Sequence, residues 1–349
     1  MLTSFWYANP AARRWSCPPP SDRAREFHAS LPGYSPTPLT ELPTLAGELG
    51  VRRVLVKDES ARLGLPAFKA LGASWAIHRI LERHEGPLTL VTATDGNHGR
   101  AVARMARLLG QRARVFTPGG VHPEAVAAIA AEGADVTEVG GSYDEAVKRA
   151  ASAAEEPGAV LVQDTAWEGY EETPGWIVEG YGTLFAELDE QLGEAPGLVV
   201  VPAGVGSLAQ AAVAHYRARS GTAVMIVEPE AAACVLAGLL EGRPARIGTG
   251  DTIMAGLNCG TPSSLAWPYL RDGLDAAVAV GDADSARAAR ELLALGVDAG
   301  PCGAASLAGA RAALTSAARR PSLGVPSDSA VVLLNTEGTA ANPALRPGG

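Results

Sequence analysis

A repeated alternation of short apolar runs with longer, helix-like segments is the feature that most constrains the fold. The strand-like runs lie at residues 52–58, 88–93, 112–118, 134–139, 159–164, 198–204, 223–229 and 330–336. Between them, apolar residues recur every three or four positions, for example at residues 97–110, 122–133 and 142–156. Short apolar strands alternating with helices predict parallel sheets flanked by helices, so we expect an α/β fold.

The length of the chain, 349 residues, favours two domains over one. Residues 89–184 hold four strand-and-helix units and are expected to form a small domain. Residues 1–88 and 185–349 would then form a large domain with a second sheet. Residues 1–35 resemble an arm that lies on the body or on a second subunit, and residues 342–349 resemble a loose tail.

Composition excludes several classes of function. The net charge is -9 and no basic cluster is present, so nucleic acid is not an expected partner. The longest uncharged run, residues 196–214, is interrupted by Pro202, Gly204 and Gly206, and no membrane association is expected. The cysteines lack metal-ligand spacing, so we expect reduced thiols, a cytoplasmic protein and no metal site. These are Cys17, Cys234, Cys259 and Cys302.

The turns between strands and helices carry the informative residues, because ligands of parallel sheets bind beyond the carboxyl ends of the strands. One turn contains Asp95 and Asn97, either of which could instead simply cap the next helix. Another contains Gly204 and Gly206, which suit a phosphate cradle or merely a tight turn. This second turn lacks the lysine and hydroxyl of a nucleoside triphosphate loop and the third glycine of a dinucleotide fingerprint.

Two further turns add polar groups, and one lysine stands apart from them. Asp164 ends an apolar strand, where it would face a cleft or cap a helix, and Thr336 and Glu337 end the last strand. Lys69 lies between a short apolar loop and an Ala-rich helix. A reactive amine, a cradle for one phosphate, an amide, two acids and a hydroxyl are what pyridoxal 5′-phosphate requires, so we expect this cofactor.

These stretches resemble the diaminopropionate ammonia-lyases, which are pyridoxal phosphate enzymes of fold type II with a tryptophan-synthase-like fold. The matching motifs are "FKALGAS", "DGNHGR", "QDTAWEGY", "PAGVGSLA", "IMAGLNCGTPS" and "NTEG". The resemblance implies elimination of ammonia from D- or L-2,3-diaminopropionate, or from a close β-substituted alanine, giving pyruvate through aminoacrylate. It also implies a small amino acid as substrate and a homodimer.

The resemblance also implies roles for individual residues. Lys69, next to Phe68, would be the Schiff-base lysine, with its amine partly desolvated and neutral. Asn97 would bind the phenolic oxygen of the cofactor, and Thr336 would lie near the pyridine nitrogen. Gly204, Val205, Gly206 and Ser207 would bind the phosphate. Asp95 would take the α-proton of a D-substrate and Lys69 that of an L-substrate, while Asp164 would position or protonate the leaving amine.

One departure from the family pattern leaves the substrate open. Residues 301–304 read Pro-Cys-Gly-Ala where the family usually shows Glu-Ser-Gly-Ala, so a carboxylate and a hydroxyl are lost near the substrate or cofactor ring. We therefore expect altered specificity with intact chemistry. A β-replacement synthase, a dehydratase acting on another β-substituted amino acid and a non-catalytic regulatory protein that binds pyridoxal phosphate remain alternatives.

Overall fold

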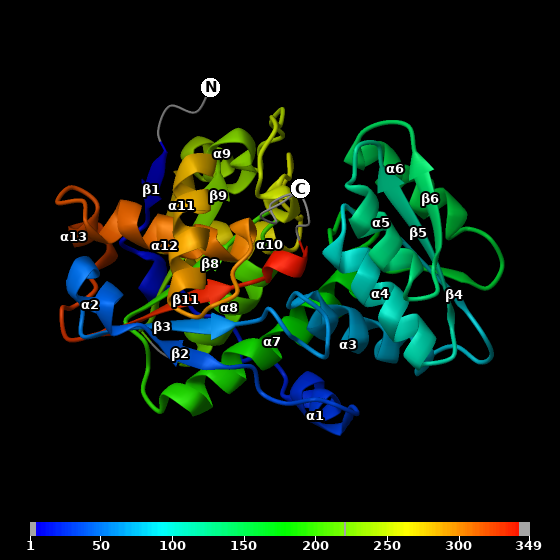
Figure 1. Cartoon of the computed structure of the whole chain (residues 1–349), viewed down its shortest axis with the longest axis horizontal. Coiled ribbons are helices and arrows are strands. Elements are labelled where there is room, and N and C mark those ends of the chain that lie inside the picture. The colour runs from blue at the N-terminus through cyan, green and yellow to red at the C-terminus, as the bar shows by residue number, and fades with distance from the viewer. Residues whose placement is uncertain (1–4, 220, 342–349) are drawn as a thin grey trace.

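The computed structural model describes residues 5–219 and 221–341, which form two β-sheets flanked by helices (Figure 1). The larger sheet has seven strands in the order β1-β10-β9-β8-β11-β3-β2. Its five inner strands are parallel, and the edge strands β1 and β2 run antiparallel to their neighbours. The strands are β1 (Trp6–Ala8), β2 (Leu39–Glu41), β3 (Arg53–Asp58), β8 (Leu198–Pro202), β9 (Ala223–Pro229), β10 (Ala276–Val280) and β11 (Ala330–Asn335).

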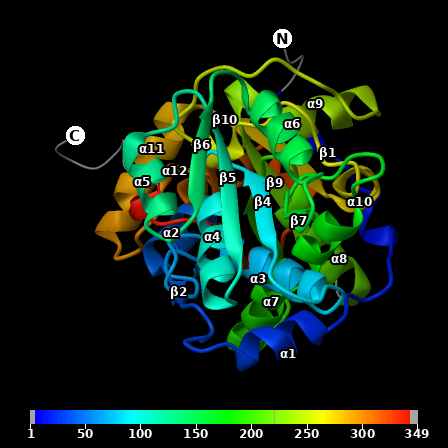
Figure 2. The ribbon, with the colours of Figure 1, turned by 90° about the vertical axis from the view of Figure 1, so that its right-hand side faces the viewer.

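The smaller sheet has four parallel strands in the order β6-β5-β4-β7 and forms the unit at the right of Figure 1, seen face-on in Figure 2. Its strands are β4 (Thr89–Ala93), β5 (Arg112–Pro118), β6 (Asp135–Val139) and β7 (Ala159–Leu161). The expected α/β class with two parallel-type sheets is therefore confirmed. All eight predicted strands are present, whereas β1, β2 and β10 were not predicted.

Helices cover both faces of the larger sheet, and a separate apolar cluster fills each face. On one face, Val331 and Leu333 pack with α2 and α12; on the other, Val332 and Leu334 pack with α3, α7 and α8. The helices are α1 (Arg23–Ser30), α2 (Pro43–Leu49), α3 (Lys69–Leu81), α4 (Asn97–Leu108), α5 (Pro123–Ala130), α6 (Tyr143–Ala153), α7 (Glu172–Leu192), α8 (Ser207–Arg219), α9 (Cys234–Glu241), α10 (Ala266–Gly273), α11 (Asp282–Ala294), α12 (Pro301–Leu314) and α13 (Arg320–Leu323). Short 3-10 turns lie at η1 (Ala12–Arg14), η2 (Glu230–Ala232), η3 (Ala255–Leu257) and η4 (Thr339–Ala341).

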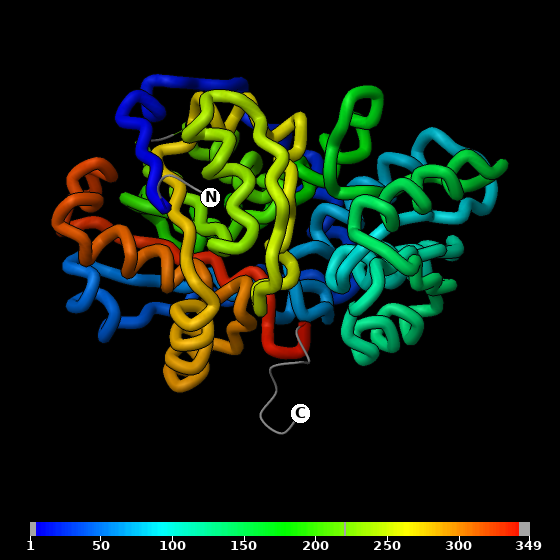
Figure 3. The backbone as a smooth tube through the Cα atoms, turned by 90° about the horizontal axis from the view of Figure 1, so that it is seen from above, coloured from blue at the N-terminus to red at the C-terminus, as the bar shows by residue number. Residues whose placement is uncertain are grey.

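The N-terminal segment lies against the larger unit (Figure 3). β1 adds to the edge of the sheet beside β10, and α1 packs on α3 and α7. The described part of the expected arm, residues 5–35, therefore packs on the larger unit. The tail expected at residues 342–349 lies outside the described residues. Within the described ranges, no helix is both long enough and apolar enough to span a membrane.

Buried ion pairs tie α7 to the loop that leads to Lys69. Lys57 on β3 and Arg62 in that loop both donate to Glu187 on α7, at 2.7 Å. Arg62 also forms paired bonds with Glu59. All four side chains are at most 1% exposed. Burying charges costs free energy, so the intact network adds little net stability and mainly fixes the position of the loop. Removing one partner would leave a buried charge uncompensated and would destabilise the protein.

Helices α3 and α7 cross at two glycines, which sets the position of Lys69 at the start of α3. A Cβ atom on Gly180 would lie 2.6 Å from the backbone oxygen of Leu71 and 2.9 Å from the Cα of Gly72. A Cβ on Gly72 would lie 2.6 Å from the ring of Tyr181. The two backbones therefore touch, and neither glycine leaves room for a larger residue.

We predict that Gly180→Ala destabilises the protein by about 1–3 kcal/mol, because the added methyl group meets backbone that cannot move aside. Gly182→Ala is the matched control on the same helix, since nothing lies within 4 Å of its Cβ position. The control should be neutral or stabilise by up to about 1 kcal/mol. Thermal unfolding of both variants measures this, and equal melting temperatures would contradict the close crossing.

Candidate active site

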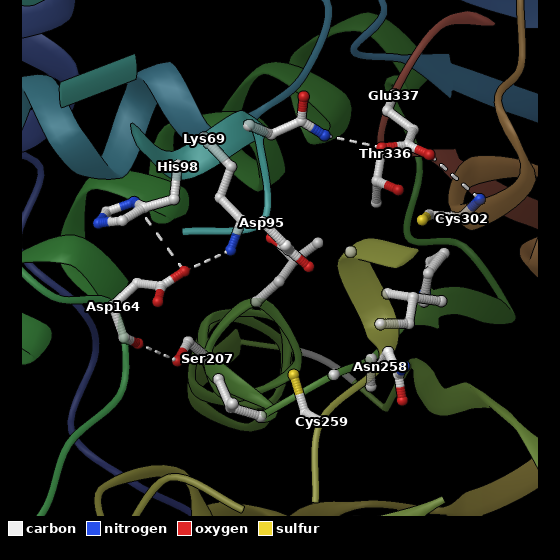
Figure 4. Close-up of a pocket in the computed structure, with 18 of the residues that line it drawn as sticks. Lys69, Asp95, His98, Asp164, Ser207, Asn258, Cys259, Cys302, Thr336 and Glu337 are labelled. Atoms are coloured by element: carbon white, nitrogen blue, oxygen red, sulfur yellow. Dashed lines mark hydrogen bonds and ion pairs between the residues drawn. The ribbon is translucent and has the colours of Figure 1, made fainter. Parts of the chain in front are cut away.

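One pocket between the two sheets brings together all of the residues singled out from the sequence (Figure 4). It is lined by the loop before α3, by the turns after β4, β8 and β11, and by the segment after β7. The predicted site residues among its walls are Phe68, Lys69, Asp95, Asn97, Asp164, Gly204, Val205, Gly206, Ser207 and Thr336. The carboxyl ends of strands from both sheets thus meet at one place.

Backbone hydrogen bonds hold the loop that presents Lys69. The Phe68 amide donates to the Thr336 carbonyl at 3.2 Å, and the Gly338 amide donates to the Pro66 carbonyl at 2.9 Å. Lys69 is the first residue of α3, and its Nζ donates to Oδ2 of Asp164 at 2.6 Å. The lysine therefore points across the pocket at a carboxylate carried by the smaller unit.

The pair of Lys69 and Asp164 is ionised in this structure. Burial favours a neutral lysine, but the attraction of Asp164 outweighs it, so the pKa of Lys69 lies above its ordinary value. Burial likewise favours a neutral Asp164, but Lys69 and then His98 hold the pKa of that carboxyl well below its usual range. The contact with Asp164 offsets the desolvation of the lysine that the sequence led us to expect.

The turn after β4 places Asp95 and Asn97 in the wall of the pocket. Oγ1 of Thr94 accepts hydrogen bonds from the amides of Gly96 and Gly99, which closes the turn. No side chain caps the start of α4, so the alternative role of Asp95 or Asn97 as a helix cap is not observed. Asn97 instead donates from Nδ2 to Oε2 of Glu337 at 2.7 Å.

Asp95 has a pKa suited to accepting a proton near neutral pH. Desolvation by the surrounding protein raises the pKa of Asp95 to about 6; Lys69 opposes this rise, while Asp164 and Glu337 add to it. The Asp95 side chain is still open to solvent within the pocket. We therefore expect the full rise in pKa only when a ligand displaces that solvent.

The glycine-rich turn after β8 forms the floor of the pocket. Gly206 has a φ of +96°, in the region that favours glycine, and α8 starts at Ser207. A Cβ on Gly204 would lie 2.9 Å from Sγ of Cys259. Oγ of Ser207 donates to the carbonyl of Asp164 at 3.0 Å, which joins this turn to the segment after β7. The start of α8 with its unpaired amides suits an anion.

The pocket also contains residues to which sequence reasoning assigned no role. His98 donates from Nε2 to the carbonyl of Val162 at 2.8 Å, and its Nδ1 lies 3.9 Å from Oδ2 of Asp164. Burial lowers the pKa of His98, while Asp164 opposes this. Tyr143, at the start of α6, accepts a hydrogen bond from Gln163. His98 belongs to a motif already noted, whereas nothing in the local sequence marks Tyr143.

The chain belongs to the family of pyridoxal phosphate-dependent enzymes, because the sequence profile of that family matches residues 31–336. Within the family it is similar to the diaminopropionate ammonia-lyase of Escherichia coli K12, with 41% identity over 71% of this chain and 69% of that protein. The enzyme of the same name from Salmonella typhimurium LT2 is 38% identical over 76% of this chain and 73% of that protein.

A crystal structure of the Escherichia coli enzyme has a TM-score of 0.87 to this chain, with 35% sequence identity and coverage of 98% of this chain and 95% of that one. That crystal contains an aminoacrylate–pyridoxal phosphate azomethine intermediate. The fold type II resemblance, the enzyme class and the cofactor expected from the sequence are confirmed by these matches.

The residues of the pocket fit the cofactor. Lys69 supplies an amine, and the turn from Gly204 to Ser207 supplies a wall without bulky side chains where a phosphate can approach backbone amides. Oγ1 of Thr336 is buried and has no hydrogen-bond partner in the protein. A buried hydroxyl without a partner is unfavourable, so it is suited to a polar atom of a bound ring. In the described ranges, no cluster of side chains suits a metal ion.

We predict that Asp164→Asn speeds the reaction of the cofactor with Lys69 in apoprotein. Removing the carboxylate lowers the lysine pKa, and below the pKa each unit of lowering increases the neutral, reactive amine about tenfold. Asp95→Asn removes a carboxylate from the same pocket but no hydrogen bond to Lys69, and should have a smaller effect. The apoprotein is mixed with pyridoxal 5′-phosphate at pH values from 6 to 9, and the increase in visible absorbance measures the rate at which the cofactor reacts with Lys69. An unchanged rate in Asp164→Asn would mean that the ion pair does not control the amine.

Proposed function

We propose that this protein eliminates ammonia from 2,3-diaminopropionate, or from a close β-substituted alanine, and releases pyruvate. The observation that carries the proposal is the placement of Lys69 between two acids of unlike pKa, with Asp164 ionised and Asp95 near 6. The identity to diaminopropionate ammonia-lyases supports it. So does a crystal structure of the Escherichia coli enzyme with D-serine, at 34% identity and a TM-score of 0.87, covering 98% of this chain and 95% of that one.

Proton removal is assigned to two bases. When bound, pyridoxal 5′-phosphate supplies an aldehyde that links to an amine and a ring that withdraws electrons from the adjacent carbon. Lys69 is the first residue of α3, Asp95 lies in the turn before α4, and both line the pocket. Asp95 would accept the α-proton of the D-isomer, and Lys69 that of the L-isomer.

Asp164 would hold the group that leaves. Its carboxylate is 6% exposed and stays ionised beside a cation. Once the amine of Lys69 is engaged elsewhere, the positive β-amino group of diaminopropionate can take its place against Oδ2. Asp164 would therefore orient the leaving amine and stabilise its protonated form. With one water consumed, diaminopropionate gives one pyruvate and two ammonia molecules.

The cofactor contacts are proposals of the same kind. Asn97 would donate to the ring oxygen, Thr336 would face the pyridine nitrogen, Phe68 would line the cofactor beside Lys69, and residues 204–207 would bind the phosphate. We also propose a homodimer, a cytoplasmic location and domain boundaries at residues 88/89 and 184/185. Sedimentation tests the homodimer, cell fractionation tests the location, and limited proteolysis tests the domain boundaries. Helix α7 crosses the second of these boundaries.

We predict that Asp95→Asn reduces D-diaminopropionate turnover by about 10²- to 10⁴-fold, the usual contribution of a general base. The amide keeps the shape of the turn but cannot accept a proton. Turnover of the L-isomer, served by Lys69, should fall much less. Because Asp95 must be ionised to act, D-turnover of the parent enzyme should rise with pH through about 6. An equal loss for both isomers would contradict the assignment of separate bases.

A panel of substrates tests the function itself. The release of a 2-oxo acid is measured with 2,3-diaminopropionate, serine, O-acylated serines, threonine and 3-hydroxyaspartate. We expect release from one or more of these substrates and none in the control variant Lys69→Ala. Losing one charge-assisted hydrogen bond at residues 301–304 costs about 1.5–3 kcal/mol, which corresponds to roughly a tenfold to hundredfold weaker preference for the cationic substrate. A preference for diaminopropionate of about 10³-fold or more would show that the departure does not alter specificity. Products formed only with an added nucleophile would indicate β-replacement instead.

A further inference from the structure

Glu337 is a buried carboxylate that lies between the starts of two helices. It is 4% exposed. Its Oε2 accepts from Nδ2 of Asn97, the first residue of α4, at 2.7 Å. Its Oε1 accepts from the backbone amide of Cys302, the second residue of α12, at 3.3 Å. Figure 4 shows both bonds at the edge of the pocket. One carboxylate therefore accepts from a backbone amide in the first turn of α12 and from the side chain of the first residue of α4.

Both oxygens of Glu337 act as acceptors. No side chain caps α12, whose preceding residue is Gly300, so Glu337 supplies from a distant part of the chain the cap that the local sequence lacks. A carboxylate can accept at both oxygens, whereas an amide of the same shape presents one acceptor and one donor. The two contacts thus require an acid at this position.

The bond to Glu337 decides which way the amide of Asn97 points. Nδ2 of Asn97 donates to Oε2 of Glu337, so the NH₂ group of Asn97 faces the carboxyl group. Burial raises the pKa of Glu337, and its hydrogen bonds with Cys302 and Asn97 oppose that rise. One N–H of that group is engaged by Glu337, which leaves the second N–H free for another acceptor. Asn97 also lines the pocket, so the fixed amide is placed where a ligand can use that second N–H.

The backbone of Glu337 is fixed as firmly as its side chain. The Gly300 amide donates to the carbonyl of Glu337 at 2.9 Å, and Glu337 forms an isolated β-bridge with Ala67. The same residue therefore touches the loop before Lys69, the start of α4 and the start of α12. A change in the side chain of Glu337 would therefore alter its hydrogen bond with Asn97, while its backbone contacts with the loop before Lys69 would remain.

We propose that Glu337 is a positioning residue that orients the side-chain amide of Asn97 toward the ring of the cofactor and caps α12 at the same time. The inference rests on the role proposed above for Asn97. It concerns binding and orientation of the cofactor, so it can be tested without turnover.

The test is a double-mutant cycle on cofactor binding. The apoproteins of the parent, Glu337→Gln, Asn97→Ala and the double variant are titrated with pyridoxal 5′-phosphate, and the dissociation constant and the wavelength of the visible band are recorded. We expect Glu337→Gln and Asn97→Ala each to weaken binding about tenfold to a hundredfold, as for loss of a charge-assisted hydrogen bond, and to shift the band alike. In the double variant the second change should add less than about threefold, because both act on one contact.

Two controls separate positioning from general damage. Glu179→Gln changes a carboxylate that accepts from Nε1 of Trp75 on α3, away from the pocket, and should alter the dissociation constant less than about twofold. Glu337→Asp keeps the charge between the helix N-termini but shortens the reach to Asn97. If Glu337→Gln does not fold, as judged by thermal unfolding of the apoprotein, the cycle is repeated with Glu337→Asp, for which the same non-additive loss is expected.

The outcomes distinguish this inference from the proposed function. If Asn97→Ala weakens binding while neither Glu337 variant does, the role of Asn97 stands and the positioning role of Glu337 is wrong. Fully additive effects would likewise overturn it. If Asn97→Ala leaves both the affinity and the band unchanged, the proposed contact of Asn97 with the cofactor fails, and the inference fails with it.

Discussion

Two backbone hydrogen bonds between residues 66–68 and residues 336–338 hold the site together. They form an isolated antiparallel bridge between Ala67 and Glu337, separate from the parallel pairing of β3 with β11, in which Asp58 lies beside Asn335. Nδ2 of Asn335 adds a bond to Oδ1 of Asp58 at 2.7 Å. Because the bridge joins the loop that carries Lys69 to the segment directly after β11, this loop has little freedom relative to Thr336 and Glu337. The reactive lysine is thereby positioned by the residues that follow the last strand of the larger sheet.

The electrostatics of the pocket follow from one cation among three carboxylates. Asp164 pairs directly with Lys69, Glu337 lies at two helix N-termini, and Asp95 has neither form of compensation. The pKa of Asp95 moves toward neutrality because desolvation and the charges of Asp164 and Glu337 favour its protonated form. Burial also raises the pKa of Glu337, whereas Lys69 holds the pKa of Asp164 low. The environment of the pocket thus moves the pKa values of similar side chains apart, which is what acid–base chemistry at a fixed pH requires.

Much of the fold and of the site could be predicted from the sequence. The strand runs are long, apolar and well separated, and residues at the ends of parallel strands meet by geometry, so Lys69, Asp95, Asp164, residues 204–207 and Thr336 were found without coordinates. Strand β10 was missed because its sequence, AAVAV, is mostly alanine and carries little strand signal; β1 and β2 are only three residues long.

The interactions within the site were less predictable. The ion pair between Lys69 and Asp164 joins residues 95 positions apart, and the bond from Asn97 to Glu337 joins residues 240 positions apart. Such contacts depend on how the two units pack, which local pattern does not encode. The same limit applies to Tyr143, whose neighbours in the sequence describe only an amphipathic helix with a capping box at Ser142.

The order of the strands along the chain has a consequence for synthesis on the ribosome. All four strands of the smaller sheet come from one continuous stretch, between Thr89 and Leu161. In the larger sheet, β11 lies between β3 and β8, so the pair of β2 and β3 is joined to the strands β8, β9 and β10 through residues 330–335. A growing chain can complete the smaller sheet from local segments, whereas the larger sheet stays in two exposed halves until β11 has emerged. Until then, the edges of β3 and β8 that will face β11 lack their partner strand.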